Sequence, residues 1–142
     1  MATITDTSSL VREIYDAYND RQFDRAADLV TDDFELTMVP TGQTFNGPDG
    51  MRQFLQTWAT GFPESSVAIT NVVAGESQAA IEYTGRGVHS GPLQTPAGEI
   101  SATGKQVELQ LCDVFSIRDG KLAGGRSYFD MATMMRQLGL LD

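Results

Sequence analysis

The stretch CDVFSIRDGKLAGGRSYFD, residues 112–130, decides the expected fold because it joins two strand-forming runs through a strong turn. Asp119-Gly120 is typical of a two-residue hairpin turn, which places Arg118 opposite Lys121. The aromatic and β-branched residues on either side favour strands. We therefore predict an antiparallel hairpin that ends near residue 130.

The register of this hairpin determines which side chains share a face. Counted on from the turn without interruption, it pairs Asp113 with Arg126 and Leu109 with Asp130. The alternate residues from 107 to 117 are otherwise apolar, so we expect their face of the sheet to be buried.

Four polar side chains are therefore expected on an apolar inner face: Asp113, Arg126, Tyr128 and Asp130. Burying an isolated charge is costly, so these groups must pair with one another or face a cavity that holds water or a ligand. The floor of a pocket satisfies both conditions.

Two structural interpretations compete with this one. Asp113 and Arg126 also fit an ion pair that only fixes the strand register. Asp130 directly precedes the last expected helix and also fits its N-cap position. In the functional interpretation, burial raises the pKa of Asp130 towards the range useful for general acid/base catalysis.

The single histidine, His89, ends a strand on the same alternation as Ile81 and Tyr83, which predicts a position at the cavity. The alternative is a surface histidine or a satisfied core histidine. The other residues expected to bind substrate, as core or as apolar pocket lining, are Tyr15, Trp58, Leu111, Phe115 and Tyr128.

The rest of the chain alternates between helical and strand patterns. Apolar residues recur at helical spacing over 9–19, 23–30 and 51–61, and a final helix is expected over 131–141. Strand patterns occupy residues 34–39, 66–75, 78–89, 105–118 and 121–130. Helices followed by an antiparallel meander predict an α+β fold in a single domain over residues 1–142.

Composition excludes several classes of function. The net charge is −9 and the basic residues are scattered, which argues against nucleic-acid binding. One cysteine and one histidine cannot form a structural zinc site or an internal disulfide. With neither a signal peptide nor an apolar run of membrane-spanning length, we expect a soluble, cytoplasmic protein with no membrane partner.

Several motifs, in order, resemble the SnoaL-like polyketide cyclases of the nuclear transport factor 2-like superfamily. They are FNGPDGMRQFLQTW (45–58), GFPES (61–65), GVHSG (87–91), ATGK (102–105), DVFSIRDGKLAGGRSYFD (113–130) and MRQLGLL (135–141). The resemblance covers nearly the whole chain.

The resemblance implies a cone, a cystatin-like α+β barrel in which a curved antiparallel sheet wraps around a pocket that the N-terminal helices close. It implies that Asp130 acts as the base in an aldol-type ring closure of a polyketide-like carbonyl compound, without metal or cofactor. Such a reaction needs a base, a donor for the oxyanion and a dry pocket. Asp130, then Arg126 or His89, and the apolar walls would supply them.

Two features depart from the family pattern. Many members carry His-Trp or Glu-Trp shortly before the aspartate, whereas this chain has Gly125-Arg126, which leaves the substrate and the reaction open. The run LQTPAGEIS, residues 93–101, is longer than usual, and loops of this kind often shape a pocket mouth.

Two further functions stay open. Asp113, Arg126 and Asp130 together resemble the two aspartates and arginine of limonene epoxide hydrolases, which indicates epoxide opening. A non-catalytic protein that binds a small hydrophobic molecule is the other alternative. The mixed outer face of the sheet, with Cys112, Val114 and Phe129, predicts a homodimer or homotetramer.

Overall fold

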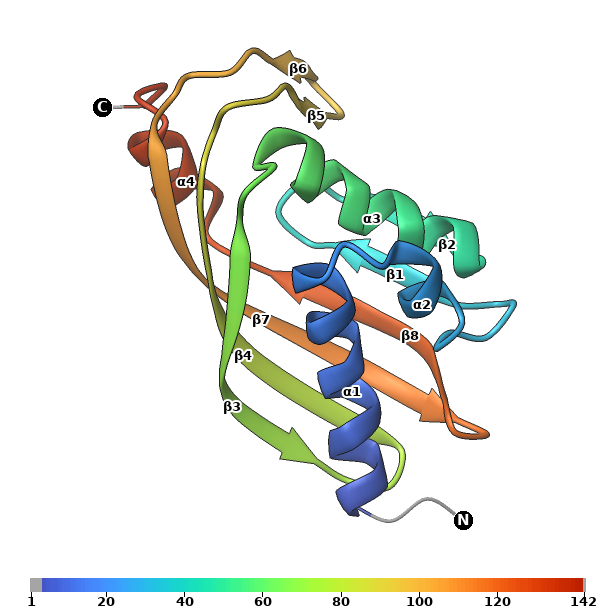
Figure 1. Ribbon diagram of the computed structural model, residues 1–142. Helices are drawn as coiled ribbons and strands as arrows, with labels where there is room; N and C mark the ends of the chain where they lie inside the picture. The colour runs from blue at the N-terminus through green and yellow to red at the C-terminus, as the bar shows by residue number, and fades with distance from the viewer. Residues whose placement is uncertain (1–3, 142) are drawn as a thin grey trace.

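The computed structural model describes residues 4–141, with side chains from residue 7 onwards. Three helices lie on the concave side of a curved sheet: α1 (Ile4–Asn19), α2 (Phe23–Ala27) and α3 (Gly47–Gly61). Figure 1 shows α1 crossing the strands at one end while α3 covers the other end. The buried core lies between these helices and the sheet.

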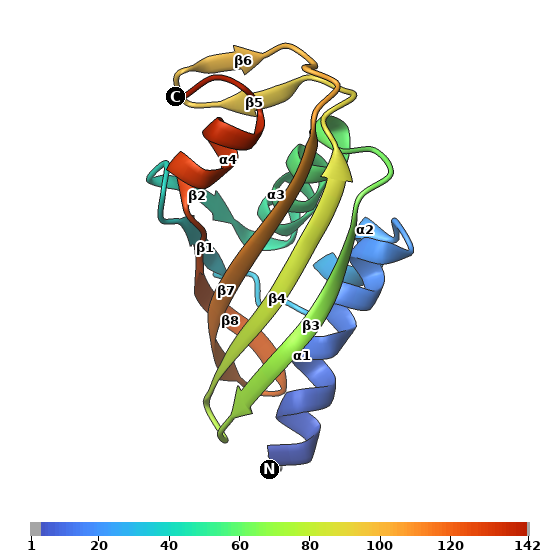
Figure 2. The same ribbon diagram turned by 90° about the vertical axis from the view of Figure 1, so that its left-hand side faces the viewer.

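The main sheet has the strand order β2-β1-β8-β7-β4-β3 and does not close into a barrel. The strands are β1 (Glu35–Met38), β2 (Gln43–Asn46), β3 (Ser66–Ala74), β4 (Gln78–Val88), β7 (Gln106–Arg118) and β8 (Lys121–Tyr128). Figure 2 shows the long strands β3, β4 and β7 running side by side with a pronounced twist and bend. This architecture confirms the predicted α+β fold with a curved sheet and N-terminal helices.

The four long strands of the meander, β3, β4, β7 and β8, were predicted, but the N-terminal strands differ from the expectation. β1 pairs with β8 in parallel, so the sheet is mixed rather than purely antiparallel. Strand β2, which pairs with β1, was not predicted, because QTFN lies directly before the turn and helix signal that dominates this region.

The long loop of residues 93–101 forms a two-stranded hairpin of its own, β5 (Leu93–Thr95) and β6 (Gly98–Ile100). Leu93 is buried against the end of α3, where a Cβ on Gly61 would lie 3.0 Å from the Leu93 side chain. The hairpin thus packs on the C-terminal end of α3, as Figures 1 and 2 show.

The register of the β7–β8 hairpin changes at a β-bulge. Arg118 pairs with Lys121, as predicted, and Ile117 pairs with Leu122, but Ser116 then pairs with Gly124, so that Ala123 is an extra residue. A one-residue slip moves every later side chain to the other face.

The predicted pairings beyond the bulge are therefore wrong. Asp113 pairs with Ser127, and Arg126 pairs with Val114 on the outer face. β8 ends at Tyr128, so Asp130 lies beyond the strand and not opposite Leu109.

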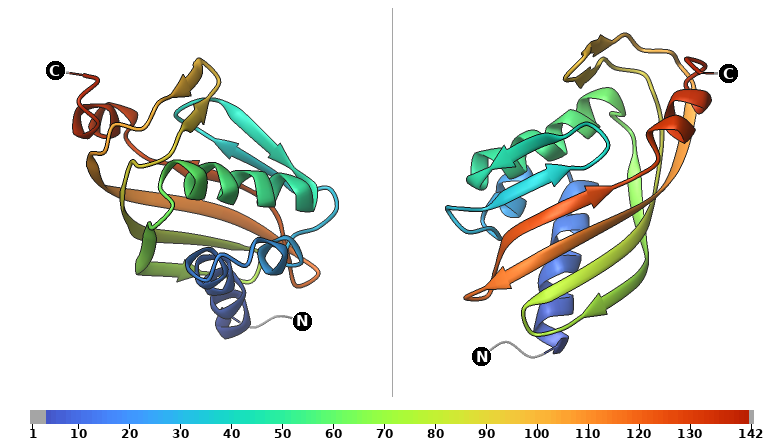
Figure 3. Two further views of the ribbon diagram at one scale, coloured as in Figure 1. Left: turned by 45° about the horizontal axis from the view of Figure 1, so that its top comes forward. Right: turned by 180° about the vertical axis from the view of Figure 1, so that it is seen from behind.

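The last helix, α4 (Met131–Gln137), packs beside the beginning of β7. Gln137 accepts a hydrogen bond from the backbone N–H of Glu108 at 2.7 Å and donates one to its carbonyl at 2.9 Å. The two views in Figure 3 place α4 at the end of the sheet far from α1. In the part of the chain that the structure describes, no helix is long and apolar enough to span a membrane.

Candidate active site

A cavity of about 70 Å³ lies between the inner face of the sheet and helices α1 and α3. Its lining is mostly apolar and comes from α1, α3, β3, β4 and β7. Four of the residues expected to bind substrate lie in its wall: Tyr15, Trp58, Leu111 and Phe115. Their role towards a ligand stays a prediction.

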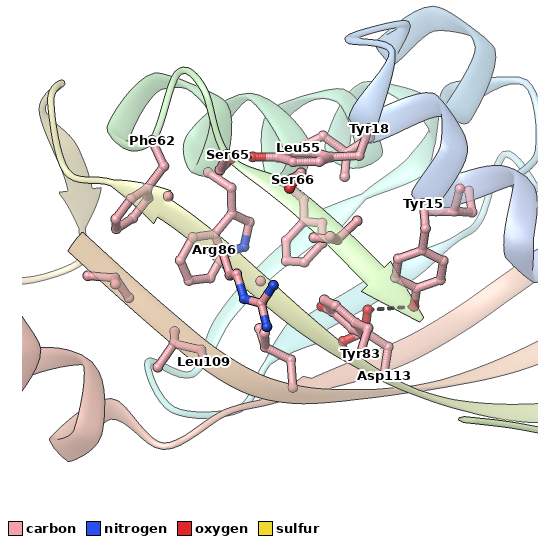
Figure 4. Close-up of a pocket in the computed structure, with 18 of the residues that line it drawn as sticks. Tyr15, Tyr18, Leu55, Phe62, Ser65, Ser66, Tyr83, Arg86, Leu109 and Asp113 are labelled. Carbon is pink, nitrogen blue, oxygen red and sulfur yellow. Dashed lines mark hydrogen bonds between the residues drawn. The ribbon is translucent and has the colours of Figure 1, made fainter. Parts of the chain in front are cut away.

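Asp113 is the one carboxylic acid in the described lining, and only 2% of its surface is exposed. The hydroxyl of Tyr15 donates a hydrogen bond to Asp113 Oδ2 at 2.8 Å, and Figure 4 shows these two side chains pointing toward each other. The other carboxyl oxygen, Oδ1, and the buried Ser127 Oγ lack a partner in hydrogen-bond geometry, but the hydroxyl groups of Ser127 and Tyr83 lie near enough to favour the ionised carboxyl group. Tyr83, from β4, lies beside the carboxyl group, and its ring centroid is 4.8 Å from that of Tyr15.

Burial has the largest effect on the proton affinity of this group. Removal from water raises the pKa of Asp113 to about 6, although the hydroxyl groups of Ser127, Tyr15 and Tyr83 act in the opposite direction. Burial and the nearby Asp113 charge also raise the pKa values of Tyr15 and Tyr83 well above their ordinary range. Both tyrosines therefore remain protonated donors at neutral pH.

The local sequence explains how these groups meet. Asp113 occupies one of the inward positions of β7, where its neighbours on the same face are Leu111 and Phe115. The bulge at Ala123 turns Ser127 inward to face it.

Sequence analysis missed Ser127, yet the Ala-Gly-Gly run before it was a usable signal, since glycine inside a strand often marks a bulge. Gly125 has a further reason to lack a side chain: a Cβ there would lie 2.7 Å from Phe115 and 2.8 Å from the carbonyl oxygen of Val114.

Asp130 does not face the cavity, and this corrects the expectation that it points inward. It is exposed and caps α4, where its carboxylate accepts hydrogen bonds from the backbone of Ala132 at 3.0 Å and of Thr133 at 3.4 Å. The Thr133 hydroxyl donates a further bond at 2.8 Å. These bonds, led by the Thr133 side chain, lower the pKa of Asp130.

Arg126 and Tyr128 also lie away from the cavity, because the bulge moves them to the outer face. Arg126 Nε donates to the Tyr128 hydroxyl at 2.9 Å. Arg126 is therefore not close to Asp113. The two residues do not form the ion pair that would fix the strand register, and Arg126 does not lie between Asp113 and Asp130. The three-residue arrangement of an epoxide-opening site is not assembled.

His89 is fully buried but lies behind the cavity wall. Its Nδ1 accepts a hydrogen bond from the backbone N–H of Thr103 at 3.2 Å, and the Thr103 hydroxyl lies 3.0 Å away. Its ring centroid is 5.3 Å from that of Phe62, which lines the cavity. Burial lowers the pKa of His89, so the ring is neutral at physiological pH and joins the two ends of the 89–105 segment.

The chemistry available at the Asp113 end is proton transfer in a water-poor pocket. A carboxyl group with a pKa of about 6 is ionised at neutral pH yet has more affinity for a proton than an exposed one. Tyrosine hydroxyls beside it can donate to a developing oxyanion. Among the described residues, no group of three or more histidine, cysteine, aspartate or glutamate side chains is arranged to hold a metal ion.

Comparisons with known proteins agree with this architecture. The sequence matches the family model described as SnoaL-like polyketide cyclase over residues 8–138. No curated protein matches the sequence.

Among solved structures, TsrD from Streptomyces laurentii is similar with a TM-score of 0.85 and 24% identity, covering 99% of this chain and 100% of that one. A candidate SnoaL-like polyketide cyclase from Jannaschia sp. CCS1 has a TM-score of 0.85 and 19% identity, covering 100% and 98%. A protein with a ketosteroid isomerase-like fold from Catenulispora acidiphila, bound to trimethylamine, has a TM-score of 0.78 and 16% identity, covering 94% and 95%.

Proposed function

The chain belongs to the SnoaL-like polyketide cyclase family, and from this premise we propose that it catalyses acid/base chemistry of the cyclase or isomerase type on an apolar carbonyl compound. The observation that supports the proposal most is the buried Asp113 carboxyl group in a largely apolar cavity, with its pKa raised to about 6. Desolvated carboxyl groups of this kind are typical of catalytic bases.

In the proposed reaction, Asp113 takes a proton from a carbon beside a carbonyl group of the substrate. The electron pair of the broken C–H bond moves to the carbonyl oxygen, which becomes an enolate and accepts a hydrogen bond from the Tyr83 hydroxyl. The enolate carbon then attacks a second carbonyl of the same molecule and forms a C–C bond. The resulting alkoxide takes the proton back from Asp113, which regenerates the carboxylate.

Asp113 fits the role of base better than Asp130 does. The Asp130 carboxylate is exposed and already accepts three hydrogen bonds at the start of α4, which lower its pKa. A weaker base that faces solvent cannot take a proton from a substrate held inside the cavity.

The proposal is tested with 2-tetralone, a small bicyclic ketone whose α-protons exchange slowly with solvent. In D₂O at pH 7, NMR should show faster α-deuteration with the wild-type protein than with buffer alone. Asp113→Asn should abolish this acceleration, while the matched variant Asp130→Asn should retain it. Undiminished exchange with Asp113→Asn would rule out Asp113 as the base.

A second candidate function is the binding of a small hydrophobic molecule without turnover. The exposure of Asp130 and the apolar lining around a single carboxyl group favour it. In that case the wild-type protein would bind 2-tetralone, seen as ligand line broadening in NMR, but would give no α-deuteration above the buffer rate.

A further inference from the structure

The cavity lining has further polar side chains away from Asp113, among them Arg86, which pairs with Glu108, and a pair of hydroxyl groups. The hydroxyl oxygens of Tyr18 and Ser65 lie 2.6 Å apart and join α1 to the segment before β3. Figure 4 shows this pair at one side of the pocket and the Tyr15–Asp113 pair at the other. Ser65 and Trp58 are partly exposed, whereas Asp113 and Tyr15 are buried, so the Tyr18–Ser65 end is the mouth of the cavity.

The hydrogen-bonding capacity of this pair is only half used. Two hydroxyl groups carry two hydrogens, and one of them makes the bond between Tyr18 and Ser65. Among the described residues, the other hydrogen donates to no protein acceptor. The pair can therefore donate one further hydrogen bond to an oxygen of a ligand.

Arg21 holds the backbone of Tyr18 and of the segment that carries Ser65. Its guanidinium lies 4.6 Å from the centroid of the Tyr18 ring and donates to the carbonyl oxygens of Tyr18 at 2.7 Å, Pro63 at 2.8 Å and Ser65 at 2.6 Å. Arg21 has a φ of 58°, a left-handed conformation that is uncommon for a residue with a side chain. This conformation is common just past a helix end, and the backbone N–H of Gln22 donates to the Ala17 carbonyl at 2.8 Å as part of the same motif. The end of α1 thus turns the arginine back toward the mouth of the cavity.

The distance between the two polar ends follows from strand β4. Ile81 of β4 pairs with Asp113. Gly87 of β4 packs against Ser65, since a Cβ added to Gly87 would lie 2.7 Å from the Cβ of Ser65. Six residues of extended strand set an upper limit of roughly 20 Å, and the two ends are closer than that because Tyr15 and Tyr18 are neighbours on α1. Between the ends the inward positions are Tyr83 and Gly85, and the glycine leaves the middle of the cavity free of a side chain.

We propose that the Tyr18–Ser65 pair is a positioning site for the trailing oxygen of an elongated, flat, apolar substrate. The reacting carbonyl of this substrate lies at Asp113, and a carbonyl or hydroxyl group at its far end accepts a hydrogen bond at the mouth. This inference rests on the proposed function for the identity of the reacting end, but the positioning site is a statement about binding alone.

The test compares two flat, fluorescent probes that differ by one terminal oxygen, trans-4,4′-dihydroxystilbene and trans-4-hydroxystilbene. Fluorescence titration gives the Kd of each for the wild-type protein, for Tyr18→Phe, for Ser65→Ala and for the double variant Tyr18→Phe/Ser65→Ala. The matched control is Tyr128→Phe, which removes a tyrosine hydroxyl from the outer face of the sheet. Because one hydrogen bond separates the probes, we expect the wild-type protein to prefer the dihydroxy probe by roughly fivefold.

Either single variant leaves one hydroxyl that can still donate, so the preference should fall to within about twofold in the double variant Tyr18→Phe/Ser65→Ala, and it should persist in Tyr128→Phe. A preference of the same size in the double variant as in the wild type, or none in the wild type, would overturn the positioning site. Failure of either probe to bind would overturn the elongated substrate class. The same titrations in Asp113→Asn keep this result separate from catalysis, since a retained preference there supports the positioning site even if Asp113 proves not to be the base.

Discussion

Asp113 and Asp130 lie on either side of the same hairpin turn, but their surroundings give the same side chain opposite properties. Asp113 is buried in the middle of β7, where loss of water raises its pKa to about 6. Asp130 is exposed at the start of α4, where hydrogen bonds to its ionised form lower its pKa. The comparison teaches that position relative to the sheet, and not residue type or nearness in sequence, decides which carboxylate suits proton transfer.

The largest expected difference between the two aspartates is in catalysis. Asp113→Asn should reduce α-proton exchange in 2-tetralone by about 10²- to 10⁴-fold, the usual contribution of a general base, whereas Asp130→Asn should change it by less than about threefold. Rates measured by NMR at pH 7 provide the comparison, and circular dichroism checks that both variants are folded. Equal losses in the two variants would remove the distinction.

The pH dependence of stability should have opposite signs at the two sites. The folded protein holds the Asp113 proton up to about pH 6, while the ordinary carboxyl value is 3.8, so stability is greatest below about pH 4 and falls as pH rises to 6. The expected loss is roughly 3 kcal/mol. Asp130, with a lowered pKa, contributes stability above the ordinary carboxyl value and loses it as pH falls through its lowered pKa.

Urea unfolding from pH 4 to pH 8 measures the Asp113 contribution, whereas the Asp130 contribution changes only below about pH 4. The difference in unfolding free energy between wild type and Asp113→Asn should shift by roughly 3 kcal/mol across pH 4 to 6, with the wild type losing stability relative to the variant as pH rises. A difference that stays constant with pH would mean that the carboxyl group has an ordinary pKa in the folded protein.

A smaller effect should come from the bulge that separates the two environments. A Cβ at residue 125 would collide with Phe115 and with the Val114 carbonyl, so Gly125→Ala should lower the free energy of unfolding by about 2 kcal/mol. At Gly124 the nearest atoms to a Cβ would be 3.3 Å and 3.4 Å away, so Gly124→Ala is the milder control. If urea unfolding gave the two variants equal stability, close packing at Gly125 would not be what holds this register.

The smallest effect is expected at the helix start. Asp130→Ala removes the N-cap of α4 and should cost about 1 kcal/mol, whereas asparagine caps nearly as well and should cost little. Thermal or urea unfolding distinguishes the two variants. A larger loss for asparagine than for alanine would show that the negative charge has a role beyond capping.

The parts of the fold that sequence predicted are those that depend on local pattern. The Asp119-Gly120 turn set the hairpin, and strict alternation set the buried face of β7, including Asp113. The bulge was not predicted, because the Ala-Gly-Gly run could hold an extra residue at more than one position. Without the bulge, the register predicted from the turn placed Arg126 on the wrong face of the sheet.

The candidate site was harder to predict because it depends on contacts between distant parts of the chain. Tyr15 and Asp113 are 98 residues apart, and their hydrogen bond forms only when α1 crosses the concave face of the sheet. The Tyr18–Ser65 pair, 47 residues apart, had no local signal. The capping alternative for Asp130, in contrast, needed only the adjacent helix, and the structure contains that cap.

The extra residue in β8 also has an evolutionary consequence. Deleting Ala123 would remove the bulge but keep Ser127 opposite Asp113, because the ladder already resumes at Gly124. If Ala123 instead paired with Ser116, every later residue would slip by one, which would bring Arg126 inward opposite Asp113 and turn Ser127 outward. Substitutions that favour this second register would thus replace a neutral hydroxyl with a guanidinium at the base of the cavity, with no change in chain length.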